Sequence, residues 1–133
     1  MGVENILVVD DEPLMGRAFQ RTLAVTGHNV DSVLSGAAAV EAVKKKRYAM
    51  AFIDQNMPGM SGIETCQALK KIDPEIKTVY ITGLFSKENV LLEQQFVEPG
   101  GVTYYLYKPF AKGEILAVVL KALGSERSQA QSS

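Results

Sequence analysis

The sequence feature that most constrains the fold is a regular alternation of short aliphatic runs with longer amphipathic segments. The runs cover residues 6–9, 49–53, 78–81 and 102–107, and a weaker one, interrupted by Asp31 and Ser32, covers residues 30–34. Each run has the length of a strand, and continuous apolar character is typical of strands that are buried on both faces. The pattern therefore predicts five strands, each followed by a helix.

The segments after the runs carry apolar residues at the three-to-four spacing of a helix with one buried face. Pro13 fits the first turn of the first helix, which Gly27 is expected to stop. Ser35 is expected to cap the second helix, Pro74 to end the third and Ser86 to cap the fourth. The expected apolar faces include Leu14, Met15, Ala18, Phe19, Leu23, Ile72 and, in the last helix, Ile115, Leu116, Val119, Leu120 and Leu123.

Strands that alternate with helices imply a parallel sheet with right-handed crossovers and helices on both faces. The predicted fold is therefore a doubly wound α/β domain with a five-stranded parallel sheet. The 133 residues fit one domain, which we place at residues 1–123. Residues 124–133 are rich in Ser and Gln without apolar periodicity, so we expect a flexible tail or the start of a linker.

Charge and composition exclude several classes of function. Lys and Arg number 14 against 15 Asp and Glu, so no direct binding of nucleic acid is expected. A single cysteine, Cys66, and a single histidine, His28, exclude an internal disulfide, a Cys-based zinc site and most triads. No apolar run approaches the roughly 20 residues of a membrane helix, and the first residues lack a signal-peptide pattern. We therefore expect a cytoplasmic protein that does not contact a membrane.

Polar side chains follow four of the expected strands at the point where each strand ends. Asp10 and Asp11 follow the first strand, Asp54 the third, Thr82 the fourth and Lys108 the fifth. Parallel strands bring their carboxyl ends to one edge of the sheet, and ligands of open α/β sheets bind outside that edge. The sequence thus predicts that three carboxylates, a hydroxyl and an ammonium group meet there.

Three clustered carboxylates repel one another, and a hard divalent cation resolves that repulsion. Mg²⁺ commonly binds a couple of carboxylates, keeps several waters and contacts substrate phosphate, which suits this group of residues. One carboxylate could then attack an electrophilic phosphorus and become an aspartyl phosphate. Thr82 and Lys108 are suited to hold the oxygens of the transferred group.

Four motifs occur in one order on the expected elements. They are VVDDEP at residues 8–13, DQNMPGMSG at 54–62, ITG at 81–83 and YLYKPF at 105–110. With them the chain resembles the response-regulator receiver domain of two-component signalling, including the single-domain chemotaxis regulators. The resemblance extends from Asn5 to about Leu123 and implies a flavodoxin-like fold with strand order 2-1-3-4-5.

The resemblance implies that Asp54 accepts a phosphoryl group from the phosphohistidine of a sensor histidine kinase. Asp11 and Asp54 would ligate Mg²⁺ directly, and Asp10 would do so directly or through water. The backbone carbonyl of Asn56 would supply another oxygen. Such a domain is a phosphoprotein of a phosphorelay that catalyses only its own phosphorylation and dephosphorylation.

The resemblance also implies a conformational switch. Lys108 would pair with the phosphoryl group, Thr82 would move to donate a hydrogen bond to it, and Tyr105 occupies the switch aromatic position. The Lys108–Pro109 bond would be cis. The surface that changes would combine the fourth helix, fifth strand and fifth helix. It would control an unknown output domain or protein. Homodimerisation on phosphorylation is one form that this response could take.

Other interpretations stay open from the sequence. A receiver-like adaptor without phosphorylation would be expected to lack an acidic residue, Thr82 or Lys108, and all are present. An aspartyl-phosphate hydrolase commonly pairs two aspartates across one residue, unlike the adjacent acidic pair here. Tyr105 has a second interpretation as half-buried packing, and Gln55 and Asn56 as simple loop residues. The side chain of Asn56, two positions after Asp54, is also placed to affect an attacking water.

The chain departs from the family between Thr82 and Lys108. This segment is longer than usual in the family, and it carries EPGG at residues 98–101 where the family has Ala-Gly-Ala. Leu84 and Phe85 are expected to suit an apolar partner beside the output surface. The sequence leaves open the kinase, the output, and whether the regulator is free-standing or part of an enzyme or a DNA-binding protein.

Overall fold

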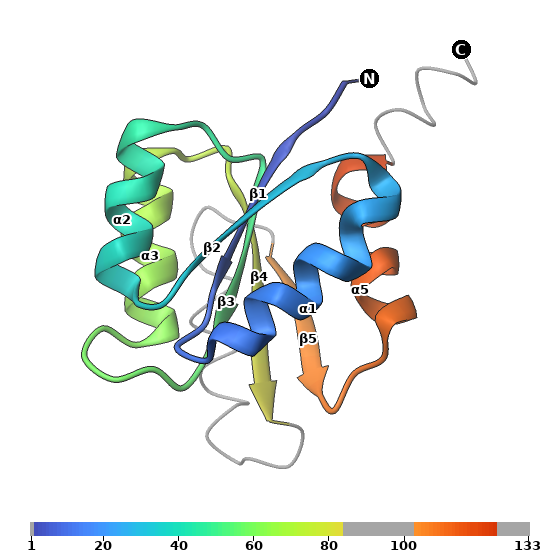
Figure 1. The fold of residues 1–133 in the computed structure, drawn as a ribbon. Helices are drawn as coiled ribbons and strands as arrows, with labels where there is room; N and C mark the ends of the chain where they lie inside the picture. The colour runs from blue at the N-terminus through green and yellow to red at the C-terminus, as the bar shows by residue number, and fades with distance from the viewer. Residues whose placement is uncertain (1, 84–102, 125–133) are drawn as a thin grey trace.

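The computed structural model describes residues 2–83 and 103–124, and a five-stranded parallel sheet forms its centre (Figure 1). The strand order is β2-β1-β3-β4-β5, as expected for a doubly wound sheet. The strands are β1 (Asn5–Val9), β2 (Asn29–Val33), β3 (Met50–Asp54), β4 (Lys77–Gly83) and β5 (Thr103–Lys108). The prediction of a parallel α/β sheet in this order is confirmed.

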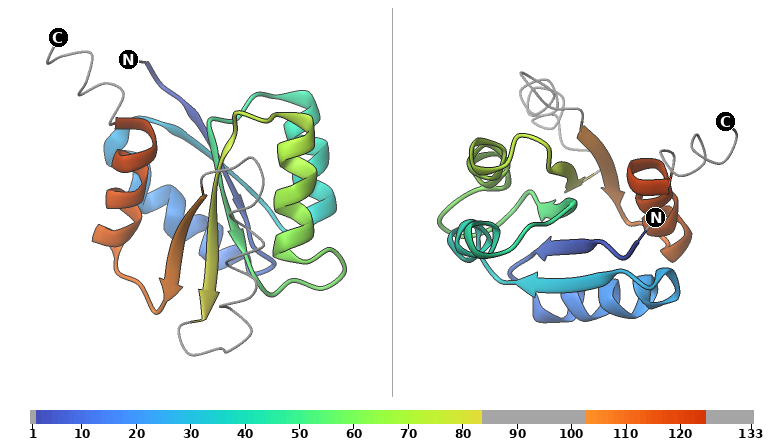
Figure 2. Two further views of the ribbon diagram at one scale, coloured as in Figure 1. Left: turned by 180° about the vertical axis from the view of Figure 1, so that it is seen from behind. Right: turned by 90° about the horizontal axis from the view of Figure 1, so that it is seen from above.

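Helices cover both faces of this sheet (Figure 2). One face is covered by α1 (Pro13–Leu23) and α5 (Lys112–Val119), and the other by α2 (Gly36–Lys45) and α3 (Gly62–Ile72). A 3₁₀ turn, Ala24–Thr26, extends α1, and a π-helical turn, Leu120–Gly124, extends α5. The helix expected to begin at Ser86, the EPGG turn, Leu84, Phe85 and residues 125–133 lie outside the described residues, so the domain boundary stays a prediction.

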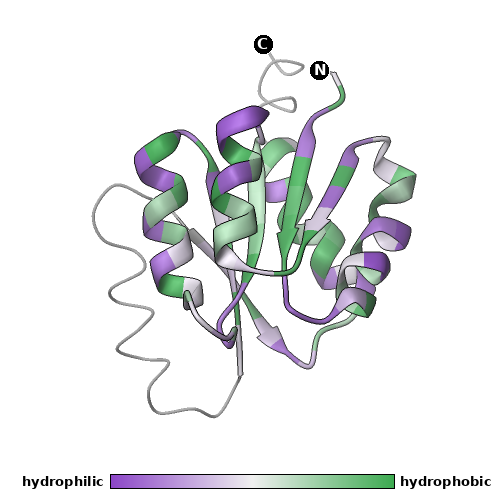
Figure 3. Cartoon of the chain, turned by 60° about the vertical axis from the view of Figure 1, so that its left-hand side comes forward, coloured by the Kyte–Doolittle hydropathy of each residue, from purple (hydrophilic) through white to green (hydrophobic). Residues whose placement is uncertain are grey.

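The core consists of two apolar layers, one on each face of the sheet. Side chains alternate along β1, so that Ile6 and Val8 belong to the layer under α1 and α5, and Leu7 and Val9 to the layer under α2 and α3. All four are fully buried, because a central parallel strand has a helix layer on each side. In Figure 3 the central strands are mainly hydrophobic, and the helices around them carry both hydrophilic and hydrophobic residues.

Two helix starts are fixed by side-chain caps. Ser35 caps α2 as expected, since its hydroxyl accepts a hydrogen bond from the Ala38 N–H at 3.1 Å. Ser61 and Glu64 cap α3 reciprocally: Ser61 Oγ accepts from the Glu64 N–H, and Glu64 Oε1 accepts from the Ser61 N–H. The Ser-x-x-Glu spacing of this cap is visible in the sequence at residues 61–64.

The apolar faces of the helices are narrower than the sequence spacing predicted. Leu14 is 74% exposed and Leu120 is 63% exposed, whereas Phe19 is fully buried. Five positions separate Leu14 from Phe19, which places them about 140° apart around a helix of 3.6 residues per turn. The expectation that Leu14, Ala18, Ile72 and Leu120 belong to the buried faces was wrong, because only the stripe that contacts the sheet is covered.

The start of α3 depends on a glycine. A Cβ at Gly62 would lie 2.5 Å from the carbonyl oxygen of Asp54 and 3.0 Å from Gln55 Cα. Both neighbours are backbone atoms at the end of β3, and the Gly62 N–H donates to the Gln55 carbonyl at 3.4 Å. No side chain larger than hydrogen fits without moving this backbone.

We expect Gly62→Ala to lower the free energy of unfolding by about 1–3 kcal/mol, the usual range for overpacking a fixed site. Gly113→Ala is the matched control, because a Cβ at Gly113, inside α5, meets no atom within 4 Å. Removing glycine from a helix stabilises by up to about 1 kcal/mol. Urea denaturation measures both effects, and an equal response of the two variants would contradict the close approach at Gly62.

A polar cluster joins the edge strand β2 to the segment before β3. The buried Tyr48 hydroxyl donates to Asp31 Oδ2 at 2.6 Å, and Lys46 Nζ lies 2.9 Å from the same oxygen. The hydrogen bonds of Lys46 and Tyr48 lower the pKa of Asp31 below its ordinary value. Asp31 therefore stabilises the fold above its unfolded-state pKa, and this contribution is lost as the pH falls through its folded-state pKa.

We expect Tyr48→Phe to lower the free energy of unfolding at pH 7 by about 1 kcal/mol. This value is at the low end of the range for a hydrogen bond to a charged acceptor, because Asp31 is partly solvated. The loss should shrink as the pH falls and Asp31 is protonated in both proteins. Urea denaturation across this pH range measures it. Glu41→Gln, which breaks the exposed 3.7 Å pair with Lys44, serves as the control and should change stability by less than about 0.5 kcal/mol. A pH-independent loss in Tyr48→Phe would contradict the role of Asp31.

Candidate functional site

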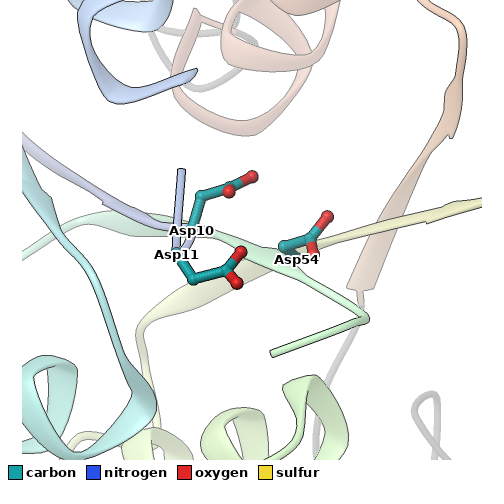
Figure 4. Close-up of side chains that lie close together, drawn as sticks. All are labelled: Asp10, Asp11 and Asp54. Atoms are coloured by element: carbon teal, nitrogen blue, oxygen red, sulfur yellow. The ribbon is translucent and has the colours of Figure 1, made fainter. Parts of the chain in front are cut away.

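Three carboxylates meet where β1 and β3 end (Figure 4). Val9 at the end of β1 pairs with Ile53 of β3, so the next positions, Asp10 and Asp54, lie side by side. One oxygen atom of Asp10, one of Asp11 and one of Asp54 all lie within 4.8 Å of one another. The structure thus brings together the three acidic residues that the sequence placed at one sheet edge.

The two inner carboxylates are buried and fixed by backbone hydrogen bonds. Asp10 is 2% exposed and Asp54 is 3% exposed, whereas Asp11 is exposed to solvent. Asp10 Oδ1 accepts from the Glu12 N–H at 2.9 Å, and Asp54 Oδ2 accepts from the Asn56 N–H at 3.1 Å. The second oxygens, Asp10 Oδ2 and Asp54 Oδ1, accept no aligned hydrogen bond from the described residues.

Lys108 at the end of β5 reaches this cluster from two strands away. Its Nζ atom lies 2.7 Å from Asp54 Oδ1, and the two groups form an ion pair. The angle between them does not meet the geometry of a hydrogen bond. Partial burial acts to lower the pKa of Lys108, but the contact with Asp54 and the charges of Asp10 and Glu12 outweigh it and raise the pKa. Lys108 is therefore a fixed positive charge at the site. The Lys108–Pro109 bond is cis, as the resemblance implied.

The environment of Asp10 disfavours its charge. Burial raises the pKa of Asp10 above its ordinary value, and the nearby charges of Asp54 and Asp11 act in the same direction. The hydrogen bond from Glu12 and the charge of Lys108 oppose this shift without cancelling it. Among the described residues, Lys108 is the lysine that meets these three acidic groups, and a second cation in the cluster would be stabilised there.

Thr82, near the end of β4, contacts Gln55, for which a role as a simple loop residue was one interpretation of the sequence. Thr82 is 1% exposed, and its hydroxyl donates a hydrogen bond to Gln55 Oε1 at 2.6 Å. Asp54 pairs with Ile81 in the β3–β4 register, so Thr82 lies one position beyond the partner of Asp54. This contact depends on the strand register, and no motif in the sequence marks Gln55 as a partner of Thr82.

Two further predicted residues lie near the site without a settled role. Asn56 is exposed, and its backbone N–H holds Asp54, as described above. Tyr105 in β5 is half-buried, pairs with Tyr80 in the sheet register and stacks on Tyr107 with ring centroids 6.3 Å apart. Both interpretations of Tyr105, packing and switch, agree with this placement, so its role stays a prediction.

The donor set fits a hard divalent cation. Carboxylate oxygens from Asp10, Asp11 and Asp54 converge, and two buried oxygens among them lack aligned donors. Mg²⁺ prefers oxygen ligands and keeps open positions for water or phosphate, and the exposed side of Asp11 leaves room for them. An anionic group that entered beside the cation would also face the ammonium of Lys108.

None of the helices in the described part of the chain combines the length and apolar character that a membrane crossing requires. The three carboxylates, Thr82 and Lys108 lie at the carboxyl edge of the sheet, where the ends of β1, β3, β4 and β5 supply them. The site is thus assembled from residues far apart in the sequence.

Known proteins share both the sequence pattern and the fold. The family model for the response regulator receiver domain matches residues 6–120. The response regulator RppA of Synechocystis is 33% identical over 129 residues, covering 96% of this chain and 53% of that protein. The transcriptional regulatory protein TcrA of Mycobacterium tuberculosis is 34% identical over 113 residues, covering 85% of this chain and 43% of that protein. The chain thus spans about half the length of these relatives.

Solved structures agree with this assignment. A response regulator receiver protein from Sinorhizobium medicae is 28% identical with a TM-score of 0.75, covering 92% of this chain and 95% of that one. The chemotaxis protein CheY4 of Vibrio cholerae shares the fold with a TM-score of 0.79 at 24% identity, covering 92% of this chain and 100% of that one. The chain therefore belongs to the response regulator receiver domain family of two-component signalling.

Proposed function

We propose that Asp54 is the phosphoacceptor of this receiver domain. The observation that carries the proposal is the position of its carboxylate between the Lys108 ammonium, 2.7 Å away, and the carboxylates of Asp10 and Asp11. A phosphoryl group on Asp54 Oδ1 would lie beside Lys108. Asp10 is a weaker candidate, because in the described part of the chain the Lys108 ammonium forms its ion pair with Asp54.

We propose that Mg²⁺ is bound by Asp10, Asp11 and Asp54, with the backbone carbonyl of Asn56 as a further oxygen ligand. The convergent carboxylates and the unsatisfied oxygen Asp10 Oδ2 support this assignment. Bound Mg²⁺ would neutralise the acidic cluster and the charge on the phosphoryl oxygens. The protein residues would then orient the Asp54 carboxylate toward the phosphorus.

In the proposed transfer, a carboxylate oxygen of Asp54 attacks the phosphorus of a phosphohistidine on a sensor histidine kinase. The new O–P bond forms as the N–P bond breaks, and the imidazole nitrogen leaves with the bonding electron pair. Lys108 pairs with a phosphoryl oxygen, and Thr82 donates a hydrogen bond to another. Water later attacks the same phosphorus and restores the carboxylate with release of inorganic phosphate, so the domain turns over only its own phosphoryl group.

We further propose a cytoplasmic switch whose output surface combines β5, α5 and the helix expected from Ser86, with Tyr105 as the responding aromatic. The names of RppA and TcrA, a response regulator and a transcriptional regulatory protein, support control of an output domain or partner. Residues 1–123 would form the switch and residues 124–133 a tail or linker. Homodimerisation on phosphorylation is one form that the response could take.

Acetyl phosphate with Mg²⁺ should add one phosphoryl group to the wild-type protein, measured as a mass increase in intact-protein mass spectrometry. Asp54→Asn should show no such increase, because the amide is not a nucleophile for phosphorus. Asp73→Asn is the matched control: Asp73 ends α3 and holds the Glu75 N–H, away from the strand ends of the site. A labelled Asp54→Asn variant would refute the choice of acceptor.

Asp10→Asn should raise the free energy of unfolding of the metal-free protein by about 1–2 kcal/mol, because it removes a buried charge and keeps the oxygen that accepts from Glu12. The gain should shrink as the pH falls through the raised pKa of Asp10, where the wild-type carboxyl is already neutral. Thermal unfolding measures this, with and without Mg²⁺.

The same measurement tests the cation. Mg²⁺ should raise the Tm of the wild-type protein and have little effect on Asp10→Asn. Asp11→Asn should also lose the Mg²⁺ effect but gain little stability without metal, because Asp11 is exposed. An undiminished Mg²⁺ response in both variants would refute this ligand set.

A further inference from the structure

In the proposed function the Thr82 hydroxyl donates a hydrogen bond to the phosphoryl group on Asp54. In the structure the same hydroxyl donates to Gln55. The Thr82 hydroxyl donates to Gln55 Oε1 at 2.6 Å, a short distance for a hydrogen bond between neutral groups. Thr82 is 1% exposed, so water has little access to compete for this contact. In the site without phosphate, the Thr82 hydroxyl is therefore held in this hydrogen bond.

The backbone of Gln55 is held from two sides. Its N–H donates to the Ile81 carbonyl at 2.9 Å, and its carbonyl accepts from the Gly62 N–H at 3.4 Å. The first bond continues the β3–β4 pairing by one residue, and the second connects to the start of α3. Because the main chain is anchored, the side chain of Gln55 reaches Thr82 from a fixed position, and the two residues are positioned by the same pair of strands.

A hydroxyl group has a single proton to donate. If Thr82 donates to Gln55, it cannot donate to a phosphoryl oxygen on Asp54 at the same time. The two acceptors compete, and the phosphoryl oxygen is the stronger one because it is charged. The Gln55 amide, which is half-buried, must give up its bond to Thr82 each time the switch operates.

We propose that Gln55 is a positioning residue that holds the Thr82 hydroxyl in the unphosphorylated state and thereby opposes the active conformation. The inference rests on the proposed role of Asp54 and Thr82, and it adds a residue that sets the equilibrium between the two states. Removing the Gln55 carbonyl favours the active conformation without any change in the acidic cluster or in Lys108.

Gln55→Met tests this, because methionine has a similar length and lacks the amide acceptor. Beryllium fluoride with Mg²⁺ serves as the probe, since it imitates a phosphoryl group on a carboxylate, and the titration is followed by amide chemical shifts. The variant should bind the probe about three- to tenfold more tightly than the wild-type protein, as expected when the neutral hydrogen bond from Thr82 to Gln55 is lost from the free state. Gln67→Met, at an exposed position of α3, is the matched control and should leave the affinity unchanged.

A double-mutant cycle identifies the partner. In a Thr82→Val background the hydroxyl is absent, so Gln55→Met should no longer change the affinity for the probe. A second measurement needs no probe: side-chain couplings of Thr82 should indicate one χ1 rotamer in the free wild-type protein and rotamer averaging in Gln55→Met. A purely structural role of Gln55 would not produce this pair of results.

The outcomes separate the two proposals. If the wild-type protein does not respond to beryllium fluoride and Mg²⁺, the phosphoacceptor site is refuted and this inference falls with it. If the wild-type protein responds but Gln55→Met binds no more tightly, only the role of Gln55 is overturned. The same holds if Gln55→Met tightens binding equally in the Thr82→Val background.

Discussion

Repulsion among the carboxylates at the ends of β1 and β3 is the interaction on which the site depends. Asp10 and Asp54 are buried next to each other, and among the described residues the ammonium group of Lys108 lies against Asp54. Burial raises the pKa of Asp10, and the charges of Asp54 and Asp11 add to this shift. Within the described part of the chain, two buried oxygens of Asp10 and Asp54 also accept no aligned hydrogen bond. In the proposed function, a cation and then a phosphoryl group would change the balance of charge at this point, and that change would drive the conformational response.

The rest of the fold holds these charges in place. Apolar layers on both faces of the sheet fix the strand ends, and backbone N–H groups fix one oxygen each of Asp10 and Asp54. The segment after Asp54 is equally constrained, because Gln55 is bonded to β4 and Gly62 packs directly on this backbone. Within this frame the Thr82 hydroxyl donates to Gln55, and in the proposed function a phosphoryl oxygen on Asp54 would compete with Gln55 for that hydroxyl.

Much of the fold follows from local sequence. Aliphatic runs predicted the strands, Ser35 predicted a cap, and the alternation of strands and helices predicted the parallel sheet. The width of the helix faces could not be predicted, because spacing alone does not show where a helix meets the sheet. Leu14 has the expected spacing and is nevertheless exposed. The pairing of Thr82 with Gln55 was also missed, since it depends on how β3 and β4 align.

The sequence by itself determined which chemical groups the domain carries and on which strand ends they lie, because strand periodicity and the identity of Asp10, Asp11, Asp54 and Lys108 are local properties. Only the tertiary structure decided which oxygen lies against the lysine, which carboxylate is buried enough to resist ionisation, and which side chain holds the threonine. Those properties depend on distances and solvent access between segments far apart in the chain, and packing alone sets them.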